Sequence, residues 1–176
     1  ADAFSVMATL LSAGGESTAS LLGNALHRPA IDHDPQTPLR GDPDLLPAFI
    51  EEMLRLESPF RYHLRHTPGP TALHGVDVPE GAAVLLLWGA ANRDPAEYER
   101  PDELLLDRPT PRHHVGFGRG IHLCVGAPLA RLEAQVILGE ILRRTTRIEL
   151  DPDDEPVRQP SLVVRRFARL PLRLVA

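Results

Sequence analysis

The sequence predicts a mainly helical protein with small β-sheets, of the α+β class. Apolar residues recur every three or four positions in 4–27, 45–56 and 126–144, which indicates helices. Between them, 60–89 holds short β-prone runs bounded by Pro and Gly, which indicate strands. The stretch 90–119 is rich in Pro and has neither period, so it predicts a long irregular segment.

The composition excludes several classes of protein. All basic residues are Arg, and the 19 of them against 24 acidic residues give a net charge of −5, which argues against a nucleic-acid partner. A single cysteine excludes an internal disulfide and a multi-cysteine zinc site, and it fits a reducing, cytoplasmic compartment. No apolar run approaches the roughly 18 residues that a membrane span needs, and no leader pattern is present.

The length of 176 residues and the 43% apolar content suit one domain over residues 1–176. The chain begins without Met, and Ala1 to Leu11 already has the pattern of the inside of an apolar helix. We therefore expect a single incomplete domain from a longer protein.

The first helix, 4–27, contains Gly14 and Gly15, each of which costs a helix about 1 kcal/mol relative to Ala. One interpretation is a helix break, with Ser17 or Thr18 capping a second helix. The next segment, 29–47, is rich in Pro and Asp and predicts a connector with at most a short helix. Helix 45–56 should stop before Ser58-Pro59, because a residue that precedes proline is disfavoured in the α region.

In the β-prone part, 72–76 and 83–87 predict strands with a turn at 79–81. The following segment, 90–119, is longer than most connections in compact domains and is a candidate functional segment. We expect contacts with the rest of the chain to hold this segment in one conformation.

The helix 126–144 is apolar almost all round, so we expect it to be buried. Pro128 is tolerated because it falls in the first turn. The tail, 148–176, predicts short strands.

One cysteine lies at the junction between a glycine-rich loop and this helix. Gly118, Gly120 and Gly126 surround Cys124 and let the backbone approach a flat cofactor. The positive end of the following helix favours a thiolate at this position. The alternative is that Cys124 is a small buried apolar residue at a helix start.

The loop resembles the haem-binding signature of the cytochrome P-450 family. The matching residues are Phe117, Gly118, Gly120, His122, Cys124 and Gly126. The segment 126–133 continues as in soluble bacterial members. The resemblance implies haem b, with Cys124 as the proximal iron ligand, Phe117 covering the porphyrin near the sulfur, and His122 bonding a haem propionate. It also implies a fold.

By resemblance, this fold is the C-terminal part of the cytochrome P-450 fold. It comprises the long oxygen-activating helix, the Glu-x-x-Arg helix, a small β-sheet, the meander, the cysteine loop and the following helix. The upstream helices that form the substrate roof in the family have no counterpart in the sequence.

The segment Ala13–Thr18 resembles the oxygen-activating segment of that family. The resemblance implies that Glu16 is the acid and Ser17 the alcohol that guide protons to oxygen, with Thr18 beside them. The family usually has Thr at the position of Ser17, and serine lacks the β-methyl group that stiffens χ1. Our hypothesis is that proton delivery survives here but is leakier and releases more peroxide.

Two acids precede Arg55 at helical spacing, Glu51 and Glu52, and spacing alone does not choose its partner. The resemblance chooses Glu52, as the Glu-x-x-Arg pair that locks the meander. In the family a basic residue usually completes this pair, and the matching position here is the acidic Glu103. This departure puts the third member of the network in doubt.

Arg65 falls on the strand position where the family places a propionate-binding arginine. Taken alone, it would more often be a solvated edge residue. Tyr62 and His63 fall in a stretch that lines the substrate pocket in relatives, and either could equally lie on the surface.

Basic residues flank the cysteine loop and could form a patch that steers a negatively charged electron donor such as a ferredoxin. They are Arg112, His113, His114, Arg119 and Arg131. As a charge cluster alone, such a patch is more often simply solvated.

The leading hypothesis is a monooxygenase that inserts one atom of O₂ into a small organic substrate. Its electrons would come from a ferredoxin and a ferredoxin reductase, and this chain alone is expected to be inactive. The alternative is a truncated, haem-free relative that acts as an interaction module or has no function. A metal site built from Cys124 and His122 would have too few ligands.

Overall fold

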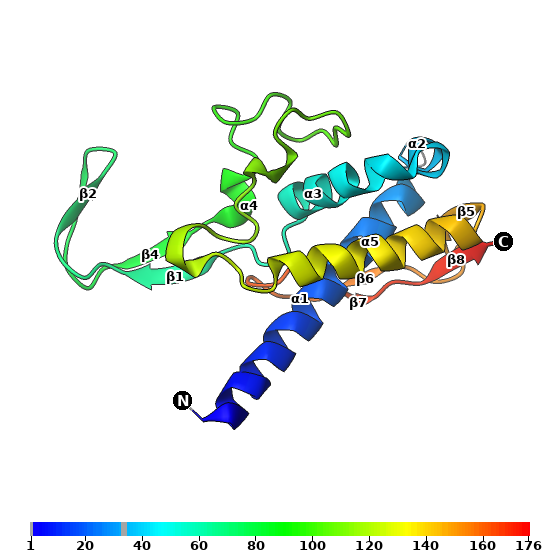
Figure 1. The fold of residues 1–176 in the computed structure, drawn as a ribbon. Coiled ribbons are helices and arrows are strands. Elements are labelled where there is room, and N and C mark those ends of the chain that lie inside the picture. The colour runs from blue at the N-terminus through cyan, green and yellow to red at the C-terminus, as the bar shows by residue number, and fades with distance from the viewer. Residues whose placement is uncertain (1, 33–34) are drawn as a thin grey trace.

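The computed structural model describes residues 2–32 and 35–176, and its centre is a packing of three helices (Figure 1). They are α1 (Ala3–Ile31), α3 (Leu46–Leu56) and α5 (Ala127–Arg144). Each of the three contacts the other two. The predicted α+β class, mainly helical with small sheets, is confirmed. Residue 1 of the first apolar stretch and residues 33–34 of the predicted connector lie outside the described residues.

The hydrophobic core forms where these helices meet. Phe49, Ile50 and Met53 of α3 are at most 2% exposed and contact Leu21 of α1 and Leu138 of α5 in one cluster. Of the three helices, α3 has the largest fraction of buried residues, since all of its residues from Phe49 to Leu56 are buried. This central helix is therefore the fixed element against which the site is built.

Helix α1 is continuous from Ala3 to Ile31, so the interpretation of a break at Gly14-Gly15 is wrong. Ser17 caps no helix, because its hydroxyl donates to the Ala13 carbonyl inside α1 at 2.6 Å. The helix also runs past the predicted end at 27 and includes Pro29 in its last turns.

Between α1 and α3 the connector holds α2 (Gln36–Gly41) and a 3₁₀ helix (Pro43–Leu45). Both are short, in line with the prediction of a connector with at most a short helix. α3 then ends at Leu56, close to the predicted boundary. The Ser58 hydroxyl donates to the Leu54 carbonyl at 2.6 Å and satisfies part of the helix end.

The β-rich part forms two antiparallel pairs instead of one sheet. β1 (His63–His66) pairs with β4 (Ala83–Leu86), and β2 (Thr71–Leu73) pairs with β3 (Val76–Val78). The predicted turn at 79–81 is confirmed, since the Ala82 N–H donates to the Pro79 carbonyl at 3.3 Å.

The prediction of one strand over 72–76 is wrong. His74 and Gly75 both adopt positive φ, 48° and 79°, and form the two-residue turn of the β2–β3 hairpin. The strand β1, on which the resemblance placed Arg65, pairs Arg65 with Val84. It matters for function because it carries Arg65 and His63.

The meander is irregular, as predicted, apart from α4 (Trp88–Ala91) and a 3₁₀ helix (Pro111–His113). A second 3₁₀ helix, Gly120–His122, forms part of the cysteine loop. The tail holds β5 (Arg147–Leu150) paired with β8 (Leu172–Val175), and β6 (Val157–Arg158) paired with β7 (Phe167–Arg169).

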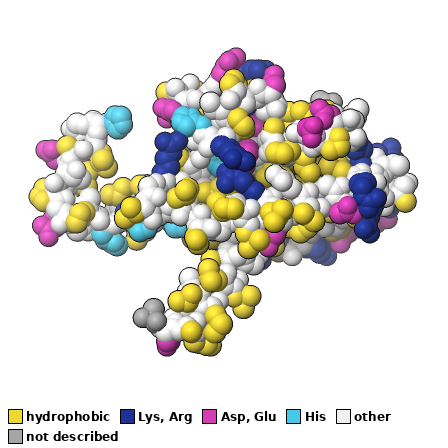
Figure 2. All heavy atoms as spheres, viewed as in Figure 1, with side chains coloured by type: hydrophobic (Ala, Val, Ile, Leu, Met, Phe, Trp, Pro, Cys, Tyr) yellow, Lys and Arg dark blue, Asp and Glu magenta, His cyan; other side chains and the backbone are white. Residues whose placement is uncertain are grey.

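Helix α5 is not buried all round, so that prediction is wrong for this chain. Ala134 and Leu138 are buried, but Leu129 and Leu132 are 58% and 57% exposed. The reason is that α1 and α3 cover one face of α5 only. The first three turns of α1 are also uncovered and project from the body with apolar side chains outward (Figures 1 and 2).

Across residues 2–32 and 35–176, no helix combines the length and the apolar character that crossing a membrane requires.

Candidate functional site

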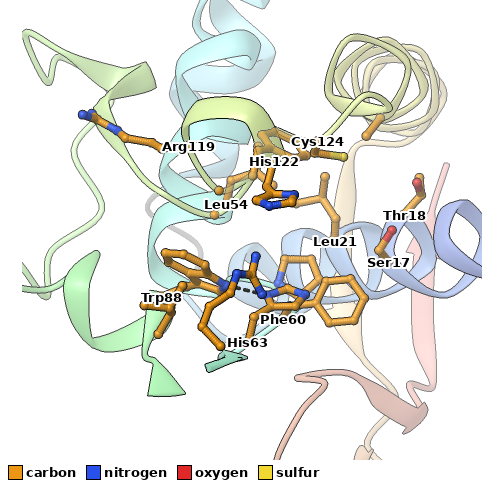
Figure 3. A pocket seen from close by; sticks show the side chains of 17 residues that line it. Ser17, Thr18, Leu21, Leu54, Phe60, His63, Trp88, Arg119, His122 and Cys124 are labelled. Atoms are coloured by element: carbon orange, nitrogen blue, oxygen red, sulfur yellow. Dashed lines mark hydrogen bonds between the residues drawn. The ribbon is translucent and has the colours of Figure 1, made fainter. Parts of the chain in front are cut away.

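A cavity of about 400 Å³ lies between α1, the cysteine loop and the β1–β4 pair. This size is typical of pockets that bind small ligands. In Figure 3, Cys124 and His122 lie on one side of it, with Trp88, His63 and Phe60 opposite and Ser17 and Thr18 at the edge formed by α1. The cavity therefore joins residues that are more than 100 positions apart.

Most of the predicted site residues line this cavity. Those that do are Ser17, Thr18, Arg65, Phe117, Gly118, His122 and Cys124. Glu16, Gly120 and Gly126 are not among the lining residues. His63 lines the cavity and its neighbour Tyr62 does not, so the structure separates these two candidates.

The cysteine loop owes its shape to backbone hydrogen bonds and to glycines. The Cys124 N–H donates to the Phe117 carbonyl at 2.9 Å and closes the loop. Gly118 and Gly120 have φ of 72° and 66°, values that side-chain-bearing residues rarely adopt. α5 begins at Ala127, three residues after Cys124, so the sulfur lies near the positive end of the helix.

The charges facing the cavity are of one sign. Arg65 and Arg119 line it, whereas no Asp or Glu does among the described residues. The Arg65 guanidinium donates to the Leu64 carbonyl at 2.8 Å and has no carboxylate partner in the described part of the chain. The cavity thus offers cationic and N–H donors to a ligand that brings its own negative groups.

On α1 the three candidate proton-handling residues are arranged differently from one another. The Ser17 hydroxyl donates its proton to the Ala13 carbonyl of the same helix. The lone pairs of the Ser17 oxygen are therefore left to accept a hydrogen bond. Glu16 forms an ion pair with Arg166, with 3.2 Å between Nε and Oε1. Both side chains of this pair are partly exposed. The acid therefore lies outside the cavity wall.

Behind the cavity, Glu52 and Arg55 form a fully buried bidentate ion pair with N–O distances of 2.7 and 2.9 Å. Burial by itself would raise the pKa of Glu52, but hydrogen bonds from Arg55, from the Leu105 N–H and from Arg108 outweigh it and lower the pKa. Arg55 also donates to the carbonyls of Asn92, Pro101 and Glu103. This pair ties the meander to α3.

The third member of that network is Arg108, whose Nε donates to Glu52 Oε1 at 2.9 Å. Glu103 takes part through its backbone carbonyl, while its side chain is exposed and pairs with Arg100. The doubt that Glu103 raised is thereby resolved. The signal that could have found Arg108 was its place in the same meander, five residues after Glu103.

A second buried network surrounds Glu51, which sequence analysis considered only as a partner for Arg55. Its carboxylate accepts hydrogen bonds from Arg131 at 2.5 and 2.9 Å and lies 2.9 Å from His114 Nε2. The Gly116 N–H donates to His114 Nδ1, which leaves the proton on Nε2 to bond Glu51. Burial would raise the pKa of Glu51, but these hydrogen bonds lower it to about 2.

This network supports the cysteine loop directly. The Arg131 guanidinium lies 4.7 Å from the centre of the Phe117 ring, and the His114 ring is 5.9 Å from it. A Cβ on Gly116 would lie 3.0 Å from the Leu54 carbonyl, so the loop packs tightly on α3. The position of Phe117 is therefore set by α3 and α5 together.

The predicted basic patch is smaller than the sequence implied. His114 is buried and Arg131 is held by the buried Glu51, so neither is part of an open cationic surface. Arg112 and Arg119 stay exposed beside the loop. The physical reason is that Glu51, five positions before the end of α3 at Leu56, reaches across to bond both side chains.

The residues of the cavity fit a haem group. Cys124 offers a sulfur ligand, Arg65 and His122 offer donors suited to propionates, and Leu21, Phe117 and Ala130 offer apolar wall. No cluster of three or more His, Cys, Asp or Glu side chains suited to a bare metal ion occurs in 2–32 and 35–176.

Comparison with known proteins identifies the family to which this fold belongs. Residues 7–173 match the family model described as Cytochrome P450. The chain is 52% identical over 167 residues to Cytochrome P450 144 of Mycobacterium tuberculosis and 45% identical to Cytochrome P450 107B1 of Saccharopolyspora erythraea. These matches cover 95% and 93% of this chain, but 38% and 41% of the relatives.

Solved structures give the same result. The fold superposes on Mycobacterium marinum cytochrome P450 CYP150A6 with a TM-score of 0.91 at 38% identity, covering 95% of this chain and 43% of that one. It superposes on CYP109E1 of Bacillus megaterium, solved in complex with testosterone, with a TM-score of 0.92 at 35% identity, covering 98% and 47%. The chain belongs to the cytochrome P450 family, and it spans about two fifths of the length of the curated relatives that it matches.

Proposed function

We propose that this chain is the C-terminal, haem-ligating part of a cytoplasmic haem-thiolate monooxygenase. The enzyme inserts one atom of O₂ into a small organic substrate, and its electrons come from a ferredoxin and a ferredoxin reductase. The observation that carries the proposal is the position of Cys124, at a helix start and on the wall of a cavity free of acidic side chains among the described residues. When bound, haem supplies the activation of O₂.

The protein groups have separate roles in this proposal. Cys124 holds the iron, and Phe117 shields the sulfur from water. Arg65 and His122 hold the propionates. Gly118 lines the cavity and keeps a side chain out of the space needed by a flat ligand, while Gly120 and Gly126 shape the loop around Cys124.

At the edge of the cavity formed by α1, Ser17 and Thr18 hold a proton donor near the oxygen-binding side, and Glu16 exchanges protons with solvent. The Ser17 hydroxyl is oriented by its bond to the Ala13 carbonyl, so the helix supplies part of the order that a β-methyl group would give. Glu52 and Arg55 are structural, because they hold the meander and do not line the cavity.

The exposed basic side chains that remain beside the cysteine loop, Arg112 and Arg119, support docking of an acidic electron donor.

The test is thiolate ligation. The chain is reconstituted with haem, reduced and exposed to carbon monoxide, and the absorption spectrum is compared with that of Cys124→Ser. We expect the Soret shift of thiolate ligation in the wild-type chain, or in a chain extended upstream, and its loss in the variant. Absence of the shift from both lengths would favour the haem-free interaction module instead.

A further inference from the structure

A hydrogen bond between two aromatic side chains lies at the wall of the cavity opposite Cys124. The Trp88 indole Nε1–H donates to His63 Nδ1 at 2.6 Å (Figure 3). β1 and β4 bring the two residues together, because His63 pairs in register with Leu86, two residues before Trp88. Both side chains line the cavity.

This bond fixes the chemistry of His63. An indole N–H only donates, so Nδ1 must carry a lone pair and the neutral ring must carry its proton on Nε2. Partial burial, with a smaller contribution from Arg65, lowers the pKa of His63 and so favours the neutral ring. The Phe60 ring, 5.4 Å away, also contacts the imidazole.

The Nε2–H has no acceptor among residues 2–32 and 35–176, although Nδ1 is tightly bound. Arg65 lies two positions further along β1, so its side chain leaves the strand on the same face, and it too lines the cavity. A neutral N–H and a guanidinium that share one face, with no protein carboxylate on the cavity wall, are suited to a ligand carboxylate.

We propose that His63 is a positioning residue that donates Nε2–H to a carboxylate bound in the cavity beside Arg65, and that Trp88 holds the imidazole in the required tautomer. The inference rests on the proposed function, because it assumes a bound haem. The carboxylate has two possible sources, a haem propionate or an acidic substrate. His63, held by Trp88, offers a neutral donor where a second cationic side chain would be repelled by Arg65.

The tautomer is tested first, without haem. In ¹⁵N-labelled chain, His63 should show the Nε2–H pattern in long-range ¹H–¹⁵N spectra, and Trp88→Phe should give a mixture of tautomers. Trp88 is the one tryptophan of the sequence, so its fluorescence reports the pair. We expect its acid titration near the His63 pKa to disappear in His63→Phe. An Nδ1–H pattern would overturn the proposal.

The carboxylate is tested by haem transfer to apomyoglobin from the full chain. His63→Phe should speed haem loss by about tenfold, as expected for one hydrogen bond to a charged group. His66→Phe is the matched control, because His66 is on the same strand, is exposed and does not line the cavity. Trp88→Phe should speed loss by a smaller factor.

Haem dimethyl ester separates the sources, since it has no carboxylates. If His63 binds a propionate, His63→Phe and wild type should lose the ester at equal rates. If it binds a substrate, His63→Phe should instead weaken dodecanoate binding relative to methyl dodecanoate. An effect on neither ligand, in a protein whose thiolate spectrum is normal, would refute the role of His63. A missing thiolate spectrum would refute the proposed function.

Discussion

The buried carboxylate of Glu51 should contribute a measurable share of the stability of this chain. Its side chain is 5% exposed, and it bonds Arg131 and His114. Lowering its pKa from 4.5 to about 2 corresponds to about 3 kcal/mol at neutral pH. Because the folded pKa lies below the unfolded one, this stability is complete above the unfolded value and is lost as the pH falls toward the folded value.

Glu51→Gln removes the charge and keeps the size. We expect urea unfolding to show that this variant loses about 3 kcal/mol of unfolding free energy near pH 7. Near pH 3 the loss should shrink to about 1 kcal/mol, because protonation of Glu51 has by then removed most of this stabilisation from the wild-type chain. Glu140→Gln is the matched control. The pKa of Glu140 is also lowered to about 2, by Arg143 and Arg144, but this carboxylate is solvated and its ion pairs are screened.

We therefore expect Glu140→Gln to leave the unfolding curve unchanged at both pH values. Equal losses in the two variants, or a Glu51→Gln loss that does not depend on pH, would show that burial of the ion pairs is not what makes Glu51 stabilising.

Three further predictions concern the loop supports and the proton path. Arg108→Met should lower the free energy of unfolding in urea by about 3 kcal/mol, because it leaves the buried Glu52 carboxylate short of a donor. Arg100→Met, at an exposed site, should change it by less than about 0.5 kcal/mol in the same assay. Gly116→Ala should destabilise the chain by about 1–3 kcal/mol, because the added Cβ overlaps backbone atoms. Gly15→Ala, in open space on a helix, should stabilise it by about 0.5–1 kcal/mol. Changes of the same sign in the unfolding free energies of the two variants would contradict this reasoning. In the haem-loaded monooxygenase, Ser17→Thr should lower the fraction of electrons recovered as hydrogen peroxide, and unchanged recovery would remove the hypothesis of leaky proton delivery.

The local elements could be predicted from the sequence because each follows from nearby residues. The helix 45–56 was placed to within one residue at each end, since its apolar spacing and the following Ser58-Pro59 are local signals. The hairpin turn at His74-Gly75 was missed because Gly75 can extend a strand as well as end one. The helix break at Gly14-Gly15 was wrong because helical residues on both sides outweigh two glycines.

The partners of charged residues could not be predicted from local spacing alone, although the resemblance correctly paired Glu52 with Arg55. Glu51 and Glu52 are adjacent in sequence and chemically identical, and each lies at helical spacing from Arg55. The helix turns by about 100° per residue, so the two carboxylates face different neighbours. One meets the meander and Arg108, and the other meets the cysteine loop and Arg131.

The sequence by itself determined the family: one cysteine among three glycines at a helix start lies in a pattern that resembles the haem-binding signature, and residues 7–173 match the family model. Only the tertiary structure decided which side chains share the cavity with that cysteine. His63 and Trp88 meet because two strands pair in one register, and a register of strands depends on contacts over distances that local patterns do not encode.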